Sequence, residues 1–147
     1  MPTALARARA SFELAPSDDL PLRFGALGRF GSASTAVGPV KRWILAADFA
    51  ACPVLFDPRI VPCAGLELGA TGASDSRPTS RSEVRPWLAP SLAVRLAVES
   101  ARRLWLELEV GSSAPLVRSD LYAGDVRIYR EKAFTFHADI GLSAELW

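Results

Sequence analysis

Apolar and polar residues alternate along most of the chain, so that every second side chain would point to the same side of an extended strand. The 3.6-residue period that is typical of helices is scarce. The alternation predicts antiparallel strands of about ten residues or more, whereas strands in soluble sheets usually have about five or six. The predicted ranges are 4–14, 22–32, 41–52, 59–71, 86–98, 103–114 and 132–147.

The two faces of these predicted strands differ in chemistry. One face is apolar throughout the middle of each strand, and the other carries charges of both signs. We call the alternate positions of a strand that carry apolar residues its apolar parity, and the positions between them its charged parity. In the segment 134–146, Phe136 and Ile140 belong to the apolar parity, whereas His137 and Asp139 belong to the charged parity. Because a tilted strand needs about 9–11 residues to cross a bilayer, the length and the apolar face together favour an all-β, up-and-down transmembrane β-barrel.

The predicted connections alternate in length. The short ones are 15–21, 53–58 and 99–102, and the longer, polar ones are 33–40, 72–85 and 115–131. Outer-membrane barrels have short periplasmic turns and longer extracellular loops, so the chain would end on the periplasmic side. Bacterial single-chain barrels usually have an even number of strands. We therefore expect an eight-strand or slightly larger barrel, of which this sequence lacks an N-terminal strand.

Composition narrows the class of protein. The 147 residues are enough for one domain, residues 1–147, with a core of its own. A formal net charge of +1 predicts no general attraction to nucleic acid. Half of the residues are apolar, yet no apolar run is long enough for a membrane-spanning helix. The sequence contains no secretory signal, so an outer-membrane location requires a signal peptide that is absent from this chain.

Cys52 and Cys63 flank the short turn PVLFDP, and both fall on the charged parity of neighbouring predicted strands. Hairpin partners at equal distance from a turn can lie within disulfide range, about 5.5–6 Å between Cα atoms. We predict a disulfide, which fits an oxidising compartment; the alternative is two unpaired buried cysteines in a cytoplasmic protein. Two cysteines without a nearby histidine are a poor ligand set, so we expect no metal, and no cofactor motif occurs.

The charged parity would face the interior of a barrel. In a barrel of about eight strands, side chains nearly fill the interior, so charges of both signs predict a packed salt-bridge network rather than a conducting channel. Arg7, Arg9 and Glu145 belong to this inward set. The network that we predict consists of Arg23, Arg29, Asp48, Glu67, Arg95, Glu107, Glu109, His137 and Asp139.

His137 is the only histidine, so a catalytic triad would have to be built around it. Asp139 and Ser143 share its parity, but residues two apart on one face of a strand lie roughly 7 Å apart, too far for a direct hydrogen bond. We therefore interpret His137 as a polar interior residue that pairs with a charge on a neighbouring strand. No catalytic activity is predicted.

Aromatic residues of the apolar parity gather near the predicted strand ends. Trp43 and Phe134 fall at the long-loop ends, as in the interfacial girdle of a membrane barrel. Aromatic residues in the core of a soluble sandwich would give the same pattern. The residues of the short-turn ends are Phe12, Phe24 and Phe49, and those of the opposite parity are Trp87, Trp105 and Trp147.

Three stretches within 41–147 resemble bacterial outer-membrane β-barrel proteins, in particular small and mostly uncharacterised barrel families of GC-rich Gram-negative genomes. They are ACPVLFDPRIVPCAGLELG, RPWLAPSLAVRLAVESARRLWLELEVGSSAPLVRSDLY and FHADIGLSAELW. The resemblance implies outer-membrane lipid and the outer-membrane assembly machinery as partners, and it supplies no catalytic residues. It also implies a C-terminal assembly signal, here Leu142, Leu146 and Trp147, although Trp147 lies one step off the apolar phase.

Two alternatives remain open at this point. The first is a soluble, lipocalin-like β-barrel or sandwich that binds an apolar ligand, with its apolar face inward. The second is an outer-membrane lipid-modifying enzyme, which would need His137 beside a serine or an acidic partner near one rim. Periodicity does not determine which face is inward, and the sequence predicts no oligomeric state.

Overall fold

The computed structural model describes residues 5–35, 38–75, 83–102, 104–118, 120–123, 126–130 and 132–144. Within these ranges, one large sheet, here called the main sheet, and one small hairpin make up the regular structure. The hairpin consists of β7 (Asp120–Ala123) and β8 (Val126–Arg130). The strands of the main sheet are β1 (Leu5–Leu14), β2 (Leu22–Thr35), β3 (Gly38–Ala51), β4 (Ile60–Asp75), β5 (Glu83–Ala101), β6 (Leu104–Ser113) and β9 (Thr135–Ala144).

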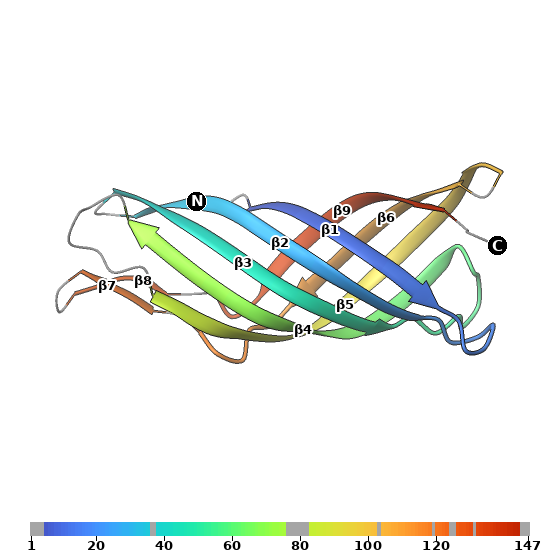
Figure 1. Cartoon of the computed structure of the whole chain (residues 1–147), viewed down its shortest axis with the longest axis horizontal. Coiled ribbons are helices and arrows are strands. Elements are labelled where there is room, and N and C mark those ends of the chain that lie inside the picture. The colour runs from blue at the N-terminus through green and yellow to red at the C-terminus, as the bar shows by residue number, and fades with distance from the viewer. Residues whose placement is uncertain are drawn as a thin grey trace.

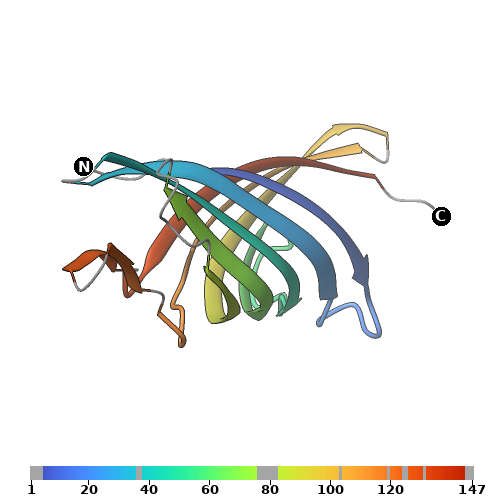
Figure 2. The same cartoon turned by 60° about the vertical axis from the view of Figure 1, so that its left-hand side comes forward.

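The main sheet follows the order of the chain, β1-β2-β3-β4-β5-β6-β9, and each strand is antiparallel to the next. This up-and-down order confirms the predicted all-β, antiparallel topology. Figure 1 shows the sheet curled into a half-barrel, and Figure 2 shows the arch that the strands form. In the described ranges, no helix has the length and apolar character needed to span a membrane.

The two ends of the half-barrel differ. The turns that join β1 to β2 and β3 to β4 lie at one end, and the β7–β8 hairpin lies at the other (Figure 1). We call these the turn end and the hairpin end. The hairpin falls inside the segment 115–131, which the sequence predicted to be a longer, polar connection. The two strands within this connection were not predicted, because β8 extends over only five positions, too few for its pattern to stand out.

The strands are longer than predicted at the hairpin end. Thr35 of β2 pairs with Gly38 of β3, so the longer loop predicted at 33–40 is mostly strand. Gly38 has a φ of 122°, which a residue without a Cβ adopts at little cost and which suits a tight reversal between paired strands. Similarly, β4 and β5 extend into the loop predicted at 72–85 and leave only 76–82 outside the described residues.

The alternation along each strand separates two chemistries. The apolar parity faces outward, where Leu92 is 66% exposed, and the charged parity faces the concave side, where Arg29 is 2% exposed. The concave side also contains an apolar cluster of Leu27, Ile44, Ala46, Trp87 and Ala89. The buried core of the half-barrel is therefore a mixture of ion pairs and small apolar clusters rather than a continuous hydrophobic layer.

Cys52 and Cys63 are joined by a disulfide at the turn end, with their Cα atoms 4.1 Å apart. The predicted pair is thus confirmed, and Val61 belongs to the same buried cluster as the two cysteines. The backbone N–H of Cys52 donates to the carbonyl oxygen of Pro21, 3.0 Å away. The disulfide therefore belongs to a compact base that connects the β3–β4 turn to the start of β2.

Candidate functional site: the charged interior

Directly opposed residues of neighbouring strands often carry the same charge on the concave face. Arg7 of β1 lies opposite Arg29 of β2, and Glu109 of β6 lies opposite Asp139 of β9. Asp48 of β3 likewise lies opposite Glu67 of β4. Like charges directly opposite each other destabilise a flat sheet. Each of these charges must therefore find its partner across the concave side, which the curling of the sheet makes possible.

Glu67 is the centre of the most deeply buried group. Its Oε1 accepts from Nη2 of Arg29 on β2 at 2.5 Å, and both side chains are 2% exposed. Its Oε2 accepts from the indole Nε1 of Trp87 on β5 at 3.0 Å. Arg29 also donates from Nη1 to the hydroxyl of Ser113 on β6 at 3.2 Å. One ion pair and two hydrogen bonds thus connect β2, β4, β5 and β6 without help from solvent.

Glu109 on β6 is the centre of a second group. Its Oε1 accepts from Nη1 of Arg9 on β1 at 2.7 Å, and its Oε2 pairs with Arg23 on β2. Arg9 also binds Asp48 on β3 through its other terminal nitrogen. Arg9 and Glu109 are 100 positions apart in the sequence, and their strands, β1 and β6, are five steps apart in the main sheet. This pair therefore forms only when the two halves of the sheet face each other.

Three further ion pairs involve Arg95 and Arg7. Nη1 of Arg95 on β5 is 2.5 Å from Oε2 of Glu13 on β1 and 3.8 Å from Oε1 of Glu107. Nη1 of Arg7 on β1 is 2.9 Å from Oδ2 of Asp139 on β9. The Arg7–Asp139 pair connects the two outermost strands of the main sheet.

Little space remains where the two groups meet. The void among Arg9, Asp48, Glu67 and Glu109 has a volume of about 10 Å³, at the lower limit for a single water molecule. A hydrated ion would require a much wider path. The geometry of the described residues therefore supports a plug of ion pairs rather than a conducting lumen.

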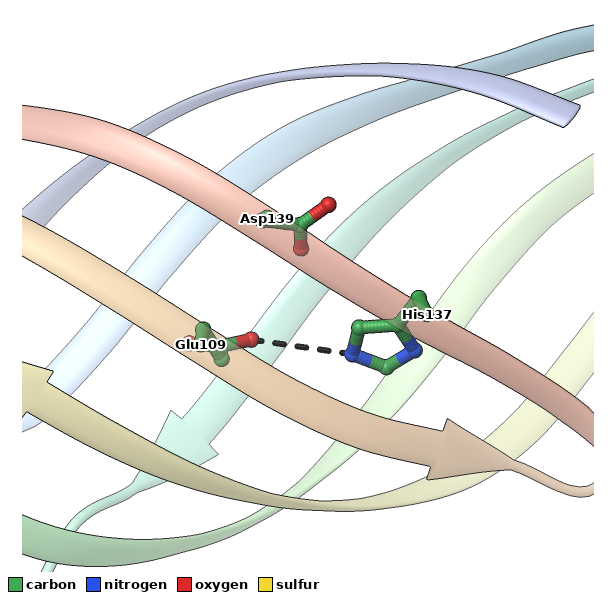
Figure 3. A group of neighbouring side chains, drawn as sticks. All are labelled: Glu109, His137 and Asp139. Carbon is green, nitrogen blue, oxygen red and sulfur yellow. Dashed lines mark ion pairs between the residues drawn. The ribbon is translucent and has the colours of Figure 1, made fainter.

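His137 points into this interior beside Glu109, and Figure 3 shows both side chains with Asp139. Nε2 of His137 is 3.7 Å from Oε1 of Glu109, longer than a hydrogen bond, and its side chain is 6% exposed. Neither ring nitrogen hydrogen-bonds to another described group. Among the side chains that the structure describes, no serine hydroxyl is hydrogen-bonded to His137.

Gly111 explains how the imidazole fits. Gly111 of β6 lies directly opposite His137 of β9, and a Cβ at Gly111 would approach Nε2 of His137 to 2.7 Å. The same Cβ would approach the carbonyl oxygen of Leu92 to 2.6 Å and the Cβ of Ala93 to 2.7 Å, both on β5. The missing side chain at Gly111 thus lets both β5 and His137 approach β6 closely.

Glu109, His137 and Asp139 offer ligand atoms that lie within 4.8 Å of one another, as a metal site requires (Figure 3). However, guanidinium groups already bind both carboxylates: Arg9 and Arg23 bind Glu109, and Arg7 binds Asp139. A divalent cation would have to enter among three positive charges or displace them. The donor set is therefore better suited to an ion-pair cluster than to a metal.

The outer face has a different character. Phe24 stacks on Phe12 with ring centroids 5.5 Å apart and meets Phe49 edge-to-face at 5.6 Å, which forms an aromatic band near the turn end. An open groove of about 490 Å³ crosses the outer face of the sheet. Its apolar lining includes Pro62, Ala64, Leu92, Val94, Val110 and Phe136.

The structure places the predicted interior residues on one concave face and brings them together in the groups described above. Arg7 and Arg9, which the sequence placed in the inward set but not in the predicted network, also form ion pairs. Three participants were assigned to neither: Trp87 and Ser113, which hydrogen-bond to the network, and Glu13, which pairs with Arg95. The sequence pattern placed these residues on the inward face, but nothing in it indicated that Trp87 would donate a hydrogen bond to a buried carboxylate. Leu142 lies on the outer face and is 71% exposed, whereas Glu145, Leu146 and Trp147 lie outside the described residues.

Comparisons of the chain with protein-family models, with curated proteins and with solved structures found no match.

Proposed function

We propose that this chain forms a transmembrane β-barrel of the Gram-negative outer membrane, with a structural or surface-presenting role and no catalytic activity. The observation that carries the proposal is the inverted distribution of side chains: large apolar residues lie outside, and paired charges lie inside. Water-soluble proteins usually show the reverse distribution.

The outer face supports a lipid environment. The exposed residues Leu45, Leu68, Leu92 and Val94 occupy the middle of β3, β4 and β5 rather than their ends. Monomeric soluble proteins rarely expose contiguous apolar patches of more than a few hundred Å², because such patches cause association. In a bilayer, the same residues would meet acyl chains, which they match in polarity.

Strand length is consistent with this environment. The strands of the main sheet have between 10 residues, as in β1, and 19 residues, as in β5. A tilted strand needs about 9–11 residues to cross the hydrocarbon core. Every strand of the main sheet is therefore long enough to cross, and the longer strands would extend beyond the bilayer at the hairpin end.

The two alternatives suggested by the sequence fit the geometry less well. A lipocalin-like protein would need an apolar interior with room for a ligand, but the concave face carries the ion pairs of Arg29 and Arg9 around a void of about 10 Å³. A lipid-modifying enzyme would need a nucleophile activated by His137, whose ring nitrogens hydrogen-bond to no described group.

Within the proposed barrel, the elements have separate roles. The ion pairs would close the interior, and the β7–β8 hairpin would project from the extracellular side, because it lies opposite the short turns (Figure 1). Leu142, Leu146 and Trp147 would form the assembly signal read by the outer-membrane assembly machinery. An eighth strand would give the even number that is usual for bacterial barrels.

The proposal is tested by expressing the chain behind a secretory signal sequence and separating the inner and outer membranes. We expect the protein in the outer-membrane fraction. We also expect the refolded protein in detergent micelles to migrate differently in gels before and after boiling, because a folded barrel resists the gel detergent. As a matched control, urea-unfolded protein should migrate identically in both lanes. A chain that stays soluble and monomeric in the absence of detergent would refute the proposal.

A further inference from the structure

The main sheet has two free edges among the described residues. The outer edge of β1 and the outer edge of β9 pair with no described strand. Six antiparallel steps separate these strands, so β1 and β9 run in the same direction, from the hairpin end to the turn end (Figure 1). We call the space between the two edges the seam.

Side-chain charges already cross the seam. Arg7 of β1 and Asp139 of β9 form an ion pair at 2.9 Å, with side chains that are 7% and 20% exposed. The next inward charges of β1, Arg9 and Glu13, are paired with Glu109 and Arg95. Along the seam, the described backbone edges of β1 and β9 therefore pair with no strand, whereas the charged side chains Arg7, Arg9, Glu13 and Asp139 have partners of opposite charge.

We propose that the seam binds one further β-strand, antiparallel to both β1 and β9. Because the two edges run in the same direction, a single strand of opposite direction can form the same antiparallel ladder on both sides. Two ladder spacings place the flanking backbones roughly 9–10 Å apart. A long arginine and a short aspartate joined tip to tip, as Arg7 and Asp139 are, can bridge that width on the concave side.

The surroundings determine the chemistry of this strand. Outward residues on both sides of the seam are apolar, for example Ala8 on β1 and Ile140 on β9, so every second residue of the bound strand must be apolar. Its inward residues must be small and uncharged, because they would pack over the Arg7–Asp139 pair, and the charged side chains described on β1 and β9 already have partners of opposite charge. A length of about ten residues matches β1 and β9.

The inference rests on the proposed function, because such a strand would complete a membrane barrel. The probe is a synthetic peptide of about ten residues, long enough to cross a bilayer, that alternates Leu or Val with Gly, Ser or Thr. It carries one cysteine at an outward position and a fluorescent label. The control peptide has the same composition, with its apolar and polar residues grouped in two blocks, so that it cannot present one apolar face.

The peptide is added during refolding of the chain in detergent micelles. We expect one alternating peptide to bind per chain, with at least tenfold weaker binding of the control peptide. Two variants, Ala8→Cys on β1 and Ala138→Cys on β9, should each form a mixed disulfide with the peptide. The native cysteines do not interfere because they are bonded to each other.

Four results would overturn the inference. Two peptides could bind per chain, or the peptide could cross-link to only one of the two edges. The double variant with Ala8→Cys and Ala138→Cys could form a disulfide between β1 and β9 without peptide. The chain could also form a stable dimer that excludes the peptide. The chain could fold in micelles, as its heat-dependent migration in gels would show, and yet bind both peptides equally. That result would refute this inference but not the proposed function. A chain that fails the membrane tests would remove the proposed function itself.

Discussion

Asp48 and Glu67 lie directly opposite each other on β3 and β4, although both are carboxylates. Asp48 is neutralised by Arg9 of β1, and Glu67 by Arg29 of β2. Each of these arginines lies two strands away from its carboxylate and reaches across the strand between them. The pairs of Glu109 with Arg9 and Arg23 join strands that are four or five steps apart, so they favour the curled arrangement, because uncurling would separate Glu109 from both cations.

The Arg29–Glu67 pair should contribute more to stability than a surface pair. Because both side chains are fully buried, Glu67→Gln should leave the charge of Arg29 without a counter-charge, at a cost of about 3–5 kcal/mol in the free energy of unfolding. Urea unfolding in micelles, followed by tryptophan fluorescence, measures the loss. Asp120→Asn, which removes the exposed pair with Arg130, is the control and should cost about 0–1 kcal/mol. Equal losses in the two variants would contradict the prediction.

The ion pair across the seam should depend on opposite charges rather than on particular residues. Asp139→Arg should lower the free energy of unfolding by about 2–3 kcal/mol, less than for a fully buried pair because Asp139 is partly exposed. Adding Arg7→Asp should recover at least half of that loss. A double variant no more stable than Asp139→Arg alone would show that the two residues are not coupled.

The close approach of β5 and His137 to Gly111 should make position 111 intolerant of any side chain. Gly111→Ala should lower the free energy of unfolding by about 1–3 kcal/mol, because the new methyl group overlaps the carbonyl oxygen of Leu92, the Cβ of Ala93 and the imidazole. Gly141→Ala on β9 is the matched control, since a Cβ there meets no atom within 4 Å. The same urea titration measures both variants, and a Gly111→Ala protein as stable as the native one would contradict this close packing of β5 and His137 against β6.

If the outer face meets lipid, a charged side chain introduced there should destabilise the protein. Leu45→Arg, in the middle of β3, should cost about 2–4 kcal/mol in a bilayer. Phe56→Arg, in the turn after β3 and 96% exposed, should cost only about 0–1 kcal/mol. Unfolding in lipid vesicles compares them. A soluble protein would tolerate both substitutions, so an unchanged Leu45→Arg variant argues for an aqueous exterior.

The disulfide should stabilise the turn end by restricting the unfolded chain. For a sequence separation of 11, the loop-entropy relation gives about 3 kcal/mol. The double variant Cys52→Ser and Cys63→Ser should lose about that much, and a reducing agent should bring the native protein to the same stability. Peptide mass mapping under non-reducing conditions should find the two cysteines linked, and two free thiols would disprove the bond.

The sequence predicted the strands and their two faces because both depend on local alternation. It did not predict the full length of β2 and β3, since the small residues around Gly38 suit a loop as well as a strand. Inward parity could be assigned to each charge, but partners could not. The pairing of Arg9 with Glu109 depends on the curvature of the whole sheet, which no local pattern encodes.

The hydrogen bond of Trp87 is another contact that the local sequence pattern could not predict. Its parity placed it away from the apolar face, yet its role as donor to Glu67 depends on β4 and β5 being neighbours in the right register. The disulfide was predictable because Cys52 and Cys63 flank one short turn. Contacts within a hairpin can therefore be derived from the sequence, and contacts across the half-barrel cannot.

The separation of the paired charges along the chain also affects the order in which the protein folds. Adjacent hairpins can form early, because their strands are close in sequence, but Arg23 and Glu109 are 86 positions apart. Such distant contacts are slow to form, since a long loop must close before they contribute. These distant charges would therefore be neutralised late, when the two halves of the sheet come to face each other.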